Sequence, residues 1–127
     1  MATLKEILDF VNATKTNQLD NYIKTKWVNR IERRIQHELQ NVALNSPDLA
    51  EYDWDVDQDT VLRIPSPYDE IYTYYLYAMI DFTYEEFELY QNDLSMFNSI
   101  YEQYGGELMN TDEDGNLHTE IPPLEVM

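Results

Sequence analysis

Carboxylates are abundant in this sequence, but no residues stand in an arrangement typical of a catalytic site. The two histidines, His37 and His118, lie far apart in the chain, and His37 stands beside Glu38 in a predicted helix, as surface histidines often do. There is no cysteine, no serine in a nucleophile-elbow pattern and no glycine-rich phosphate loop. We therefore expect a protein that is not an enzyme, with no catalytic residue and no cofactor.

Two acidic segments have part of the spacing of a calcium site. Residues 110–117 match the beginning of an EF-hand loop, but the final ligand position, which needs a bidentate carboxylate, is Ile121, and Glu120 comes one residue early. We therefore predict no metal site, and a calcium-binding module stays a lesser alternative. A second segment alternates four aspartates with other residues but lacks the turn glycine, and a strand with one acidic face explains it as well: Asp53, Asp55, Asp57 and Asp59.

Charge is distributed unevenly along the chain. The net charge is −17, yet seven of the eight lysines and arginines lie between Lys5 and Arg34. Residues 1–43 have a balance of +2, whereas residues 44–127 have one base, Arg63, and a balance of −19. Phosphates would be repelled, so non-specific binding of nucleic acid is not expected.

The charge pattern has two interpretations. An acidic surface keeps a protein soluble whatever its function. Alternatively, the basic part of the chain forms a subunit interface with an acidic face of a neighbouring copy, through five predicted contact residues: Lys24, Lys26, Arg30, Arg33 and Arg34.

The apolar periodicity predicts helices at the start of the chain. Thr3 and Glu6 have the spacing of a capping box, which opens a first helix that a polar segment, residues 12–17, ends. Its apolar face comprises Leu4, Ile7, Leu8 and Val11. A second helix is predicted over residues 18–42, followed by an extended connection over residues 43–64. Apolar residues recur in this helix every four positions: Ile23, Trp27, Ile31, Ile35 and Leu39.

Two further helices are predicted after this connection. Ser66 can cap the third, with Pro67 at its first position and Asp69 in its first turn. The fourth has an apolar seam and ends at Gly105-Gly106, while residues 83–85 either bend between the two helices or continue straight. The seam comprises Phe87, Tyr90, Leu94, Phe97, Tyr101 and Tyr104. Over the whole chain, the predicted core comprises Trp27, Ile31, Ile35, Leu76, Ile80, Phe87, Leu94, Phe97 and Tyr101.

The predicted fold class is all-α, a small bundle of about four helices with a mobile acidic C-terminal tail. The helical domain spans residues 1–106 and the tail spans residues 107–127. We expect no signal peptide and no membrane span, because no apolar run is long enough. Apolar residues cluster at the end of the tail, where they are predicted to dock into a groove on another subunit: Ile121, Leu124, Val126 and Met127.

The second half of the chain resembles a known family. The segment IPSPYDEIYTYYLYAMIDFTYEEFELYQNDLSMFNSIYEQY is similar to small head–tail connector (adaptor, or head-completion) proteins of long-tailed phages. The shared residues are Pro65, Pro67, Tyr68, Asp69, Ile80, Asp81, Glu86, Tyr90 and Asn92, followed by Met96, Phe97 and Asn98. Upstream, Lys15, Asn17, Trp27, Glu32 and Ile35 resemble the family's second helix. The likeness covers roughly residues 3–104.

The resemblance implies a structural virion protein. Connector subunits form a ring, usually a dodecamer, beneath the portal protein, where they extend the DNA channel and bind a stopper or other tail-side protein. DNA passes through without specific binding, no membrane is involved, and no catalytic residue or cofactor is present. The implied location is the head–tail interface of a virion, after synthesis in the host cytoplasm. The resemblance implies that the apolar residues at the end of the tail dock on the portal or on an adjacent connector subunit. One departure concerns the helix junction, where the family often has Asn-Gly and this chain has Tyr84-Glu85, so a straighter junction is expected.

An acidic DNA mimic that inhibits a host DNA-binding protein is the main alternative. Such a mimic needs carboxylates spaced like phosphates over a continuous face, and it gains nothing from a basic helix. Binding to a portal ring favours the connector, whereas binding to a host DNA-binding protein favours the mimic.

Overall fold

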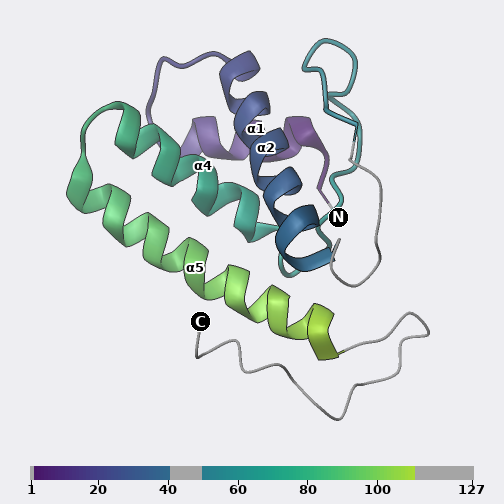
Figure 1. Ribbon diagram of the computed structural model, residues 1–127. Helices are drawn as coiled ribbons and strands as arrows, with labels where there is room; N and C mark the ends of the chain where they lie inside the picture. The colour runs from purple at the N-terminus through teal and green to yellow at the C-terminus, as the bar shows by residue number, and fades with distance from the viewer. Residues whose placement is uncertain (1, 41–49, 111–127) are drawn as a thin grey trace.

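The protein is an assembly of helices, as the sequence predicts. The computed structural model describes residues 2–40 and 50–110, and within these ranges it contains no β-strand, only an isolated bridge between Thr3 and Val61 (Figure 1). The predicted all-α class is confirmed. The elements are α1 (Leu4–Thr14), α2 (Asn21–Ile35), the π-helical turn η1 (Gln36–Gln40), α4 (Glu70–Thr83) and α5 (Phe87–Asn110).

Helix α1 begins with the predicted capping box. The Thr3 hydroxyl accepts a hydrogen bond from the Glu6 amide, and the Glu6 carboxylate accepts one from the Thr3 amide at 2.9 Å. These bonds satisfy donors that a helix start otherwise leaves unpaired. All four predicted apolar residues of this helix are buried, and the helix ends at Thr14, inside the polar segment: Leu4, Ile7, Leu8 and Val11.

Helix α2 is shorter than the periodicity predicts. It begins at Asn21, where the Asp20 side chain accepts a hydrogen bond from the Ile23 amide, and it passes into η1 after Ile35. Trp27 and Ile31 are buried as predicted, whereas Ile23 remains 37% exposed. The four-residue spacing therefore identifies the buried face but not the point at which the helix begins.

The connection before α4 contributes to the core as well as linking two helices. Residues 50–64 contain turns, and Tyr52, Leu62 and Ile64 are buried in the same hydrophobic core as α1, α2, α4 and α5. The connection also completes the start of α1, because the amide of Leu4 donates to the Thr60 carbonyl at 3.0 Å. This segment is an integral part of the domain.

Helix α4 begins later than the sequence indicates. The Ser66-Pro67 peptide bond is cis, residues 66–69 form turns, and the first helical residue is Glu70. The Ser66 hydroxyl donates to the Asp69 carboxylate at 3.0 Å, and the helix has no side-chain cap. The prediction of Ser66 as cap and Pro67 as first helical residue is wrong, because Ser, Pro and Asp favour tight turns as readily as helix starts.

Helices α4 and α5 form a hairpin, side by side along most of their length (Figure 1). The straighter junction expected from Tyr84-Glu85 is wrong. Glu85 adopts the left-handed conformation with φ of 59°, the conformation for which a glycine is best suited. The turn is closed by backbone hydrogen bonds from Glu85 to Phe82 and from Glu86 to Asp81.

We expect Glu85→Gly to stabilise the protein by about 0.5–1 kcal/mol, because glycine removes the steric cost of the left-handed conformation. Part of this gain is offset, because glycine has more conformational entropy to lose when the chain folds. Thermal or urea unfolding measures the change. Glu85→Ala is the matched control, since it removes the same charge but keeps a β-carbon. Equal stability of the two variants would show that charge, and not backbone conformation, determines the effect.

Helix α5 continues through the predicted stop at Gly105-Gly106. The helix ends at Asn110, and Gly105 is buried inside it. Tertiary contacts stabilise this part of the helix, because the adjacent Tyr104 is buried and its ring lies 5.2 Å from that of Tyr68. The predicted helix stop at Gly105-Gly106 is therefore wrong, and the domain boundary at residue 106 stays a prediction. The tail from residue 111 onward, with its predicted docking residues, lies outside the described residues.

Candidate functional site

The residues considered for metal binding or catalysis form no such site in the described part of the chain. His37 is exposed, and no group of His, Cys, Asp or Glu within residues 2–40 and 50–110 is arranged to hold a metal ion. The alternating aspartates lie in a turn, not a strand, where the Asp57 carboxylate accepts the Asp53 amide at 2.7 Å. The EF-hand-like segment and His118 lie outside the described residues.

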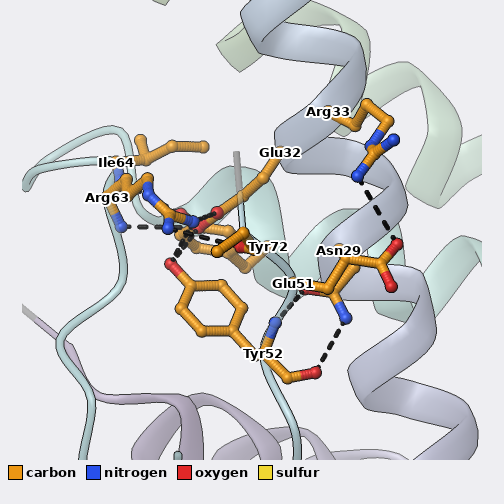
Figure 2. A network of polar contacts seen from close by, with 9 residues as sticks. Asn29, Glu32, Arg33, Glu51, Tyr52, Arg63, Ile64 and Tyr72 are labelled. Carbon is orange, nitrogen blue, oxygen red and sulfur yellow. Dashed lines mark hydrogen bonds and ion pairs between the residues drawn. The ribbon is translucent and has the colours of Figure 1, made fainter. Parts of the chain in front are cut away.

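A buried carboxylate, Glu32 of α2, organises the largest polar network (Figure 2). Its Oε2 accepts hydrogen bonds from the hydroxyls of Tyr52 at 2.8 Å and Tyr72 at 2.5 Å, while Oε1 pairs with the Arg63 guanidinium. Burial, followed by the nearby Glu32 charge, raises the pKa of both tyrosines, so they stay protonated as donors. The network joins α2, the connection and α4.

The same network fixes the connection at a second point. Asn29 forms two hydrogen bonds with the backbone of Tyr52, one through each amide atom, at 2.8 and 3.0 Å. The Tyr72 hydroxyl also accepts from the Ile64 amide at 3.0 Å (Figure 2). All strong polar partners of Glu32 are therefore internal, which indicates a role in holding the fold together.

A second buried ionic cluster joins three helical segments. Lys15, directly after α1, contacts Asp81 of α4 at 2.7 Å and Asp93 of α5 at 3.3 Å. Asp81 is 1% exposed, and its Oδ2 lacks a hydrogen-bond donor when both acids are ionised. Burial and the hydrogen bond with Asp81 raise the pKa of Asp93 to about 6, while Lys15 opposes this shift. A proton on Asp93 can therefore serve Asp81 Oδ2.

The sequence does not predict this cluster as a unit. The signal was an acid within the apolar run TYYLYAMIDF. An acid on the buried side of a helix requires a partner. Periodicity cannot show that the partner is Lys15, 66 positions away in the sequence.

Asp93→Asn should stabilise the protein at about pH 7.5 and have little effect at about pH 4. The folded-state pKa of Asp93, about 6, lies above its ordinary value of 3.8. The contribution of Asp93 to the free energy of unfolding therefore falls as the pH rises between these two values. Asparagine removes the cost of ionisation. Unfolding at both pH values measures the difference. Glu88→Gln, an exposed change on the same helix, is the charge-matched control, and an equal gain from it would contradict the prediction.

The five predicted interface cations do not share one surface. Lys24 is buried, and its ammonium donates to the Asn12 side chain and the Leu19 carbonyl at 2.6 Å. The prediction of Lys24 as a contact residue is therefore wrong, because its long side chain reaches back to orient the α1–α2 linker. Arg33 pairs with Glu51 at 3.6 Å (Figure 2), and Arg34 pairs with Glu38 at 3.0 Å.

Lys26 and Arg30 are exposed on α2 and make no ion pair with any described residue. Ile23 lies three positions before Lys26 and on the same side of the helix. We call Ile23, Lys26 and Arg30 the cationic stripe. Arg34 lies at its edge, with its guanidinium 4.9 Å from the centre of the Tyr101 ring. Of the five predicted interface residues, Lys24 alone is buried, and the side chain of Arg33 is 43% exposed. Lys26, Arg30 and Arg34 are exposed.

The predicted core is largely confirmed, with one clear exception. Leu94 and Tyr101 are half-buried, whereas Phe87 is 52% exposed, so its prediction as a core residue is wrong. Phe87 is the first residue of α5, and the last turn of α4 covers it only in part, because the ring that it meets there, Phe82, is itself 53% exposed. The remaining predicted core residues are buried: Trp27, Ile31, Ile35, Leu76, Ile80 and Phe97.

Phe87 belongs to an exposed aromatic group at the α4–α5 junction. Its ring lies 5.9 Å from that of Phe82, which lies 5.3 Å from that of Tyr90. Three acids of the same segment, Glu85, Glu86 and Glu88, have exposed side chains. We define the hairpin tip as Phe82, Tyr84, Glu85, Glu86, Phe87, Glu88 and Tyr90.

Comparison with known proteins identifies no relative: no family model matches the chain, and no curated protein or solved structure matches it significantly. Within the described residues, no helix combines the length and apolar character needed to cross a membrane.

Proposed function

We propose that this chain is a head–tail connector subunit that forms a ring beneath a phage portal protein, extends the DNA channel and docks a tail-side protein. The resemblance of residues 64–104 suggests the family. The structural observation that carries the proposal is the presence of two unlike surfaces, the cationic stripe and the acidic, aromatic hairpin tip, on one small helical domain. A ring needs two different faces on each subunit, because its interface is heterologous.

The charge of the subunit is compatible with a DNA channel. Two carboxylates that hold the fold together, Glu32 and Asp81, are buried, but many others remain exposed on the connection and on α5. Exposed carboxylates at a lumen repel DNA phosphates and prevent DNA from adhering as it passes. The proposed role requires no bound metal or catalytic residue.

The DNA-mimic alternative fits the surface less well. A mimic presents a continuous acidic face, whereas α2 exposes Lys26 and Arg30 among the acids of this subunit. The acids of α4 and α5 are also unequally exposed, since Asp81 and Asp93 turn inward toward Lys15. These features favour an assembly subunit over a phosphate-like surface.

Co-expression with the portal protein encoded in the same genome tests the proposal. We expect the two proteins to elute together on gel filtration, and electron microscopy to show an additional ring on the portal. A chain that elutes alone beside an intact portal would overturn the connector function. Capture of a host DNA-binding protein, competed by DNA, would support the mimic instead.

A further inference from the structure

The hairpin tip exposes more apolar surface than the turn needs. Phe82, Tyr84 and Phe87 are 53%, 43% and 52% exposed, and Leu89 beside them is 46% exposed. Scattered apolar side chains are normal on a protein surface, but adjoining ones with a polar rim are typical of an interaction site. The tip lies at one edge of the molecule, and the connection over residues 50–64 lies at the other (Figure 1).

Folding does not explain why these aromatic side chains are exposed. The turn is closed by main-chain hydrogen bonds, including the Tyr84 amide to the Ile80 carbonyl at 3.1 Å and the Glu86 amide to the Asp81 carbonyl at 2.9 Å. Any side chain leaves those bonds in place. The Tyr84 hydroxyl does accept the Gln18 amide at 2.9 Å, so Tyr84 has a structural contact. Phe82 and Phe87, in contrast, contact mainly one another and Tyr90.

The cationic stripe has the complementary chemistry. It presents two positive charges without ion pairs to described residues, beside the partly exposed Ile23. Tyr22, 52% exposed, adjoins it and extends the apolar part. The hairpin tip offers the matching set, with carboxylates at Glu85 and Glu88 next to the Phe82 and Phe87 rings. Opposite charges around an apolar centre are the usual arrangement of a protein interface.

We infer that the hairpin tip of one copy of this chain binds the cationic stripe of a second copy. Glu85 and Glu88 pair with Lys26 and Arg30, and the Phe82 and Phe87 rings pack against Ile23. The inference rests on the proposed function and adds to it the residues through which neighbouring subunits meet. Because the two surfaces differ, each copy binds one neighbour through its tip and another through its stripe, which generates a ring or an open filament.

A second copy fits the stripe better than nucleic acid does. The net charge of −17 repels phosphates, and two cations provide only a small counterion-release gain. Every copy, by contrast, carries one acidic hairpin tip and one cationic stripe, so the two surfaces are present in equal numbers. Since the charges are exposed, the contact should weaken with salt, and subunits alone should associate only weakly.

Zero-length carbodiimide coupling tests the contact, because it joins an ammonium and a carboxylate only where they touch. We would mix isotopically labelled and unlabelled full-length chains at low salt and high concentration. Mass spectrometry should then find Lys26 joined to Glu85 or Glu88 in peptides of mixed label, which must come from two copies. Coupling of Lys26 only to other acids, or no coupling between copies, overturns the inference.

Charge exchange makes the test specific. The tip variant is Glu85→Lys with Glu88→Lys, and the stripe variant is Lys26→Glu with Arg30→Glu. Each alone should lose the coupling of Lys26 to Glu85 or Glu88, because one of the two surfaces is altered in every copy. In an equal mixture this coupling should return, because the unaltered stripe of the tip variant meets the unaltered tip of the stripe variant. The two altered surfaces also complement one another, so the lysines introduced at the tip should couple to the glutamates introduced at the stripe. Circular dichroism checks that both variants keep their helices. Glu70→Lys with Glu102→Lys, at exposed acids away from the tip, changes the net charge equally and should retain the wild-type coupling.

Outcomes for this contact and for the connector function are separable. Coupling between copies is measured without a portal. If the mixed-label products change with the charge-exchange variants as expected, but the chain does not bind the portal, the contact between copies is supported and the connector function is rejected. A chain that binds the portal while its tip and stripe variants still form complete rings would keep the function and overturn the contact.

Discussion

Phe97→Ala should lower the free energy of unfolding by about 3–5 kcal/mol, whereas Phe87→Ala should change it by less than about 1 kcal/mol. Both residues occupy the apolar seam of α5, ten positions apart in the chain. Phe97 is fully buried and its ring lies 5.5 Å from both the Tyr75 and Tyr101 rings. Removing it leaves a cavity that α2 and α4 cannot fill.

The two alanine variants form a matched pair, because the chemical change is identical and only the burial differs. Urea unfolding followed by the far-ultraviolet signal measures both, and a shared slope against denaturant shows that the unfolded states are comparable. Similar losses for the two variants would contradict the structure at the hairpin tip. An intact Phe87→Ala variant is also useful for the subunit contact, where it should reduce coupling between copies without loss of fold.

The difference between Phe87 and Phe97 shows what periodicity can predict. A spacing of three and four residues identifies the face that turns toward a neighbouring helix, and Phe97 and Tyr104 are buried on that face. Periodicity does not show where the neighbouring helix ends. Helix α4 ends at Thr83, so Phe87 lies at the edge of the α4–α5 packing, where its ring meets only the exposed end of α4 at Phe82.

Short sequence patterns predicted helix ends correctly where each pattern fits only one local structure. The Thr3 and Glu6 spacing predicted the start of α1 correctly, since few other structures satisfy both of its hydrogen bonds. The Ser-Pro and Gly-Gly signals failed because they depend on the surroundings. Gly105 and Gly106 continue a helix whose preceding residue, Tyr104, is buried. The packing of Tyr104 outweighs the modest helix penalty of the two glycines.

Long-range polar contacts were beyond prediction from a single sequence. Glu32 meets Arg63 and Tyr72, and Lys24 turns back to Asn12, through distances in the chain that no pattern specifies. The basic segment was therefore assigned wholly to the surface. Its side chains are in fact divided between holding the fold and facing solvent, and only the latter remain available for a partner.

Lys15→Met should be the most damaging single change of charge in the protein. We expect it to lower the free energy of unfolding by about 3–5 kcal/mol. Two lysines contact a carboxylate at the same 2.7 Å, Lys15 with Asp81 and Lys5 with Asp9. Their surroundings differ, because both side chains of the Lys5 pair are more than half exposed and Asp81 is 1% exposed. Water replaces a lost partner at Asp9, but it cannot reach Asp81.

The matched variant Lys5→Met should therefore change stability by less than about 1 kcal/mol in the same unfolding assay. Acid should reduce the loss in Lys15→Met, since a proton on Asp93, whose pKa is raised to about 6, removes one of the two negative charges that the missing ammonium no longer balances. Adding Asp81→Asn to Lys15→Met should recover part of the stability at neutral pH, because the buried charge is then gone. If the double variant were less stable than Lys15→Met by the full cost of Asp81→Asn alone, the two side chains would be energetically independent, and the ion pair that joins α1 to the hairpin would not be what holds them together.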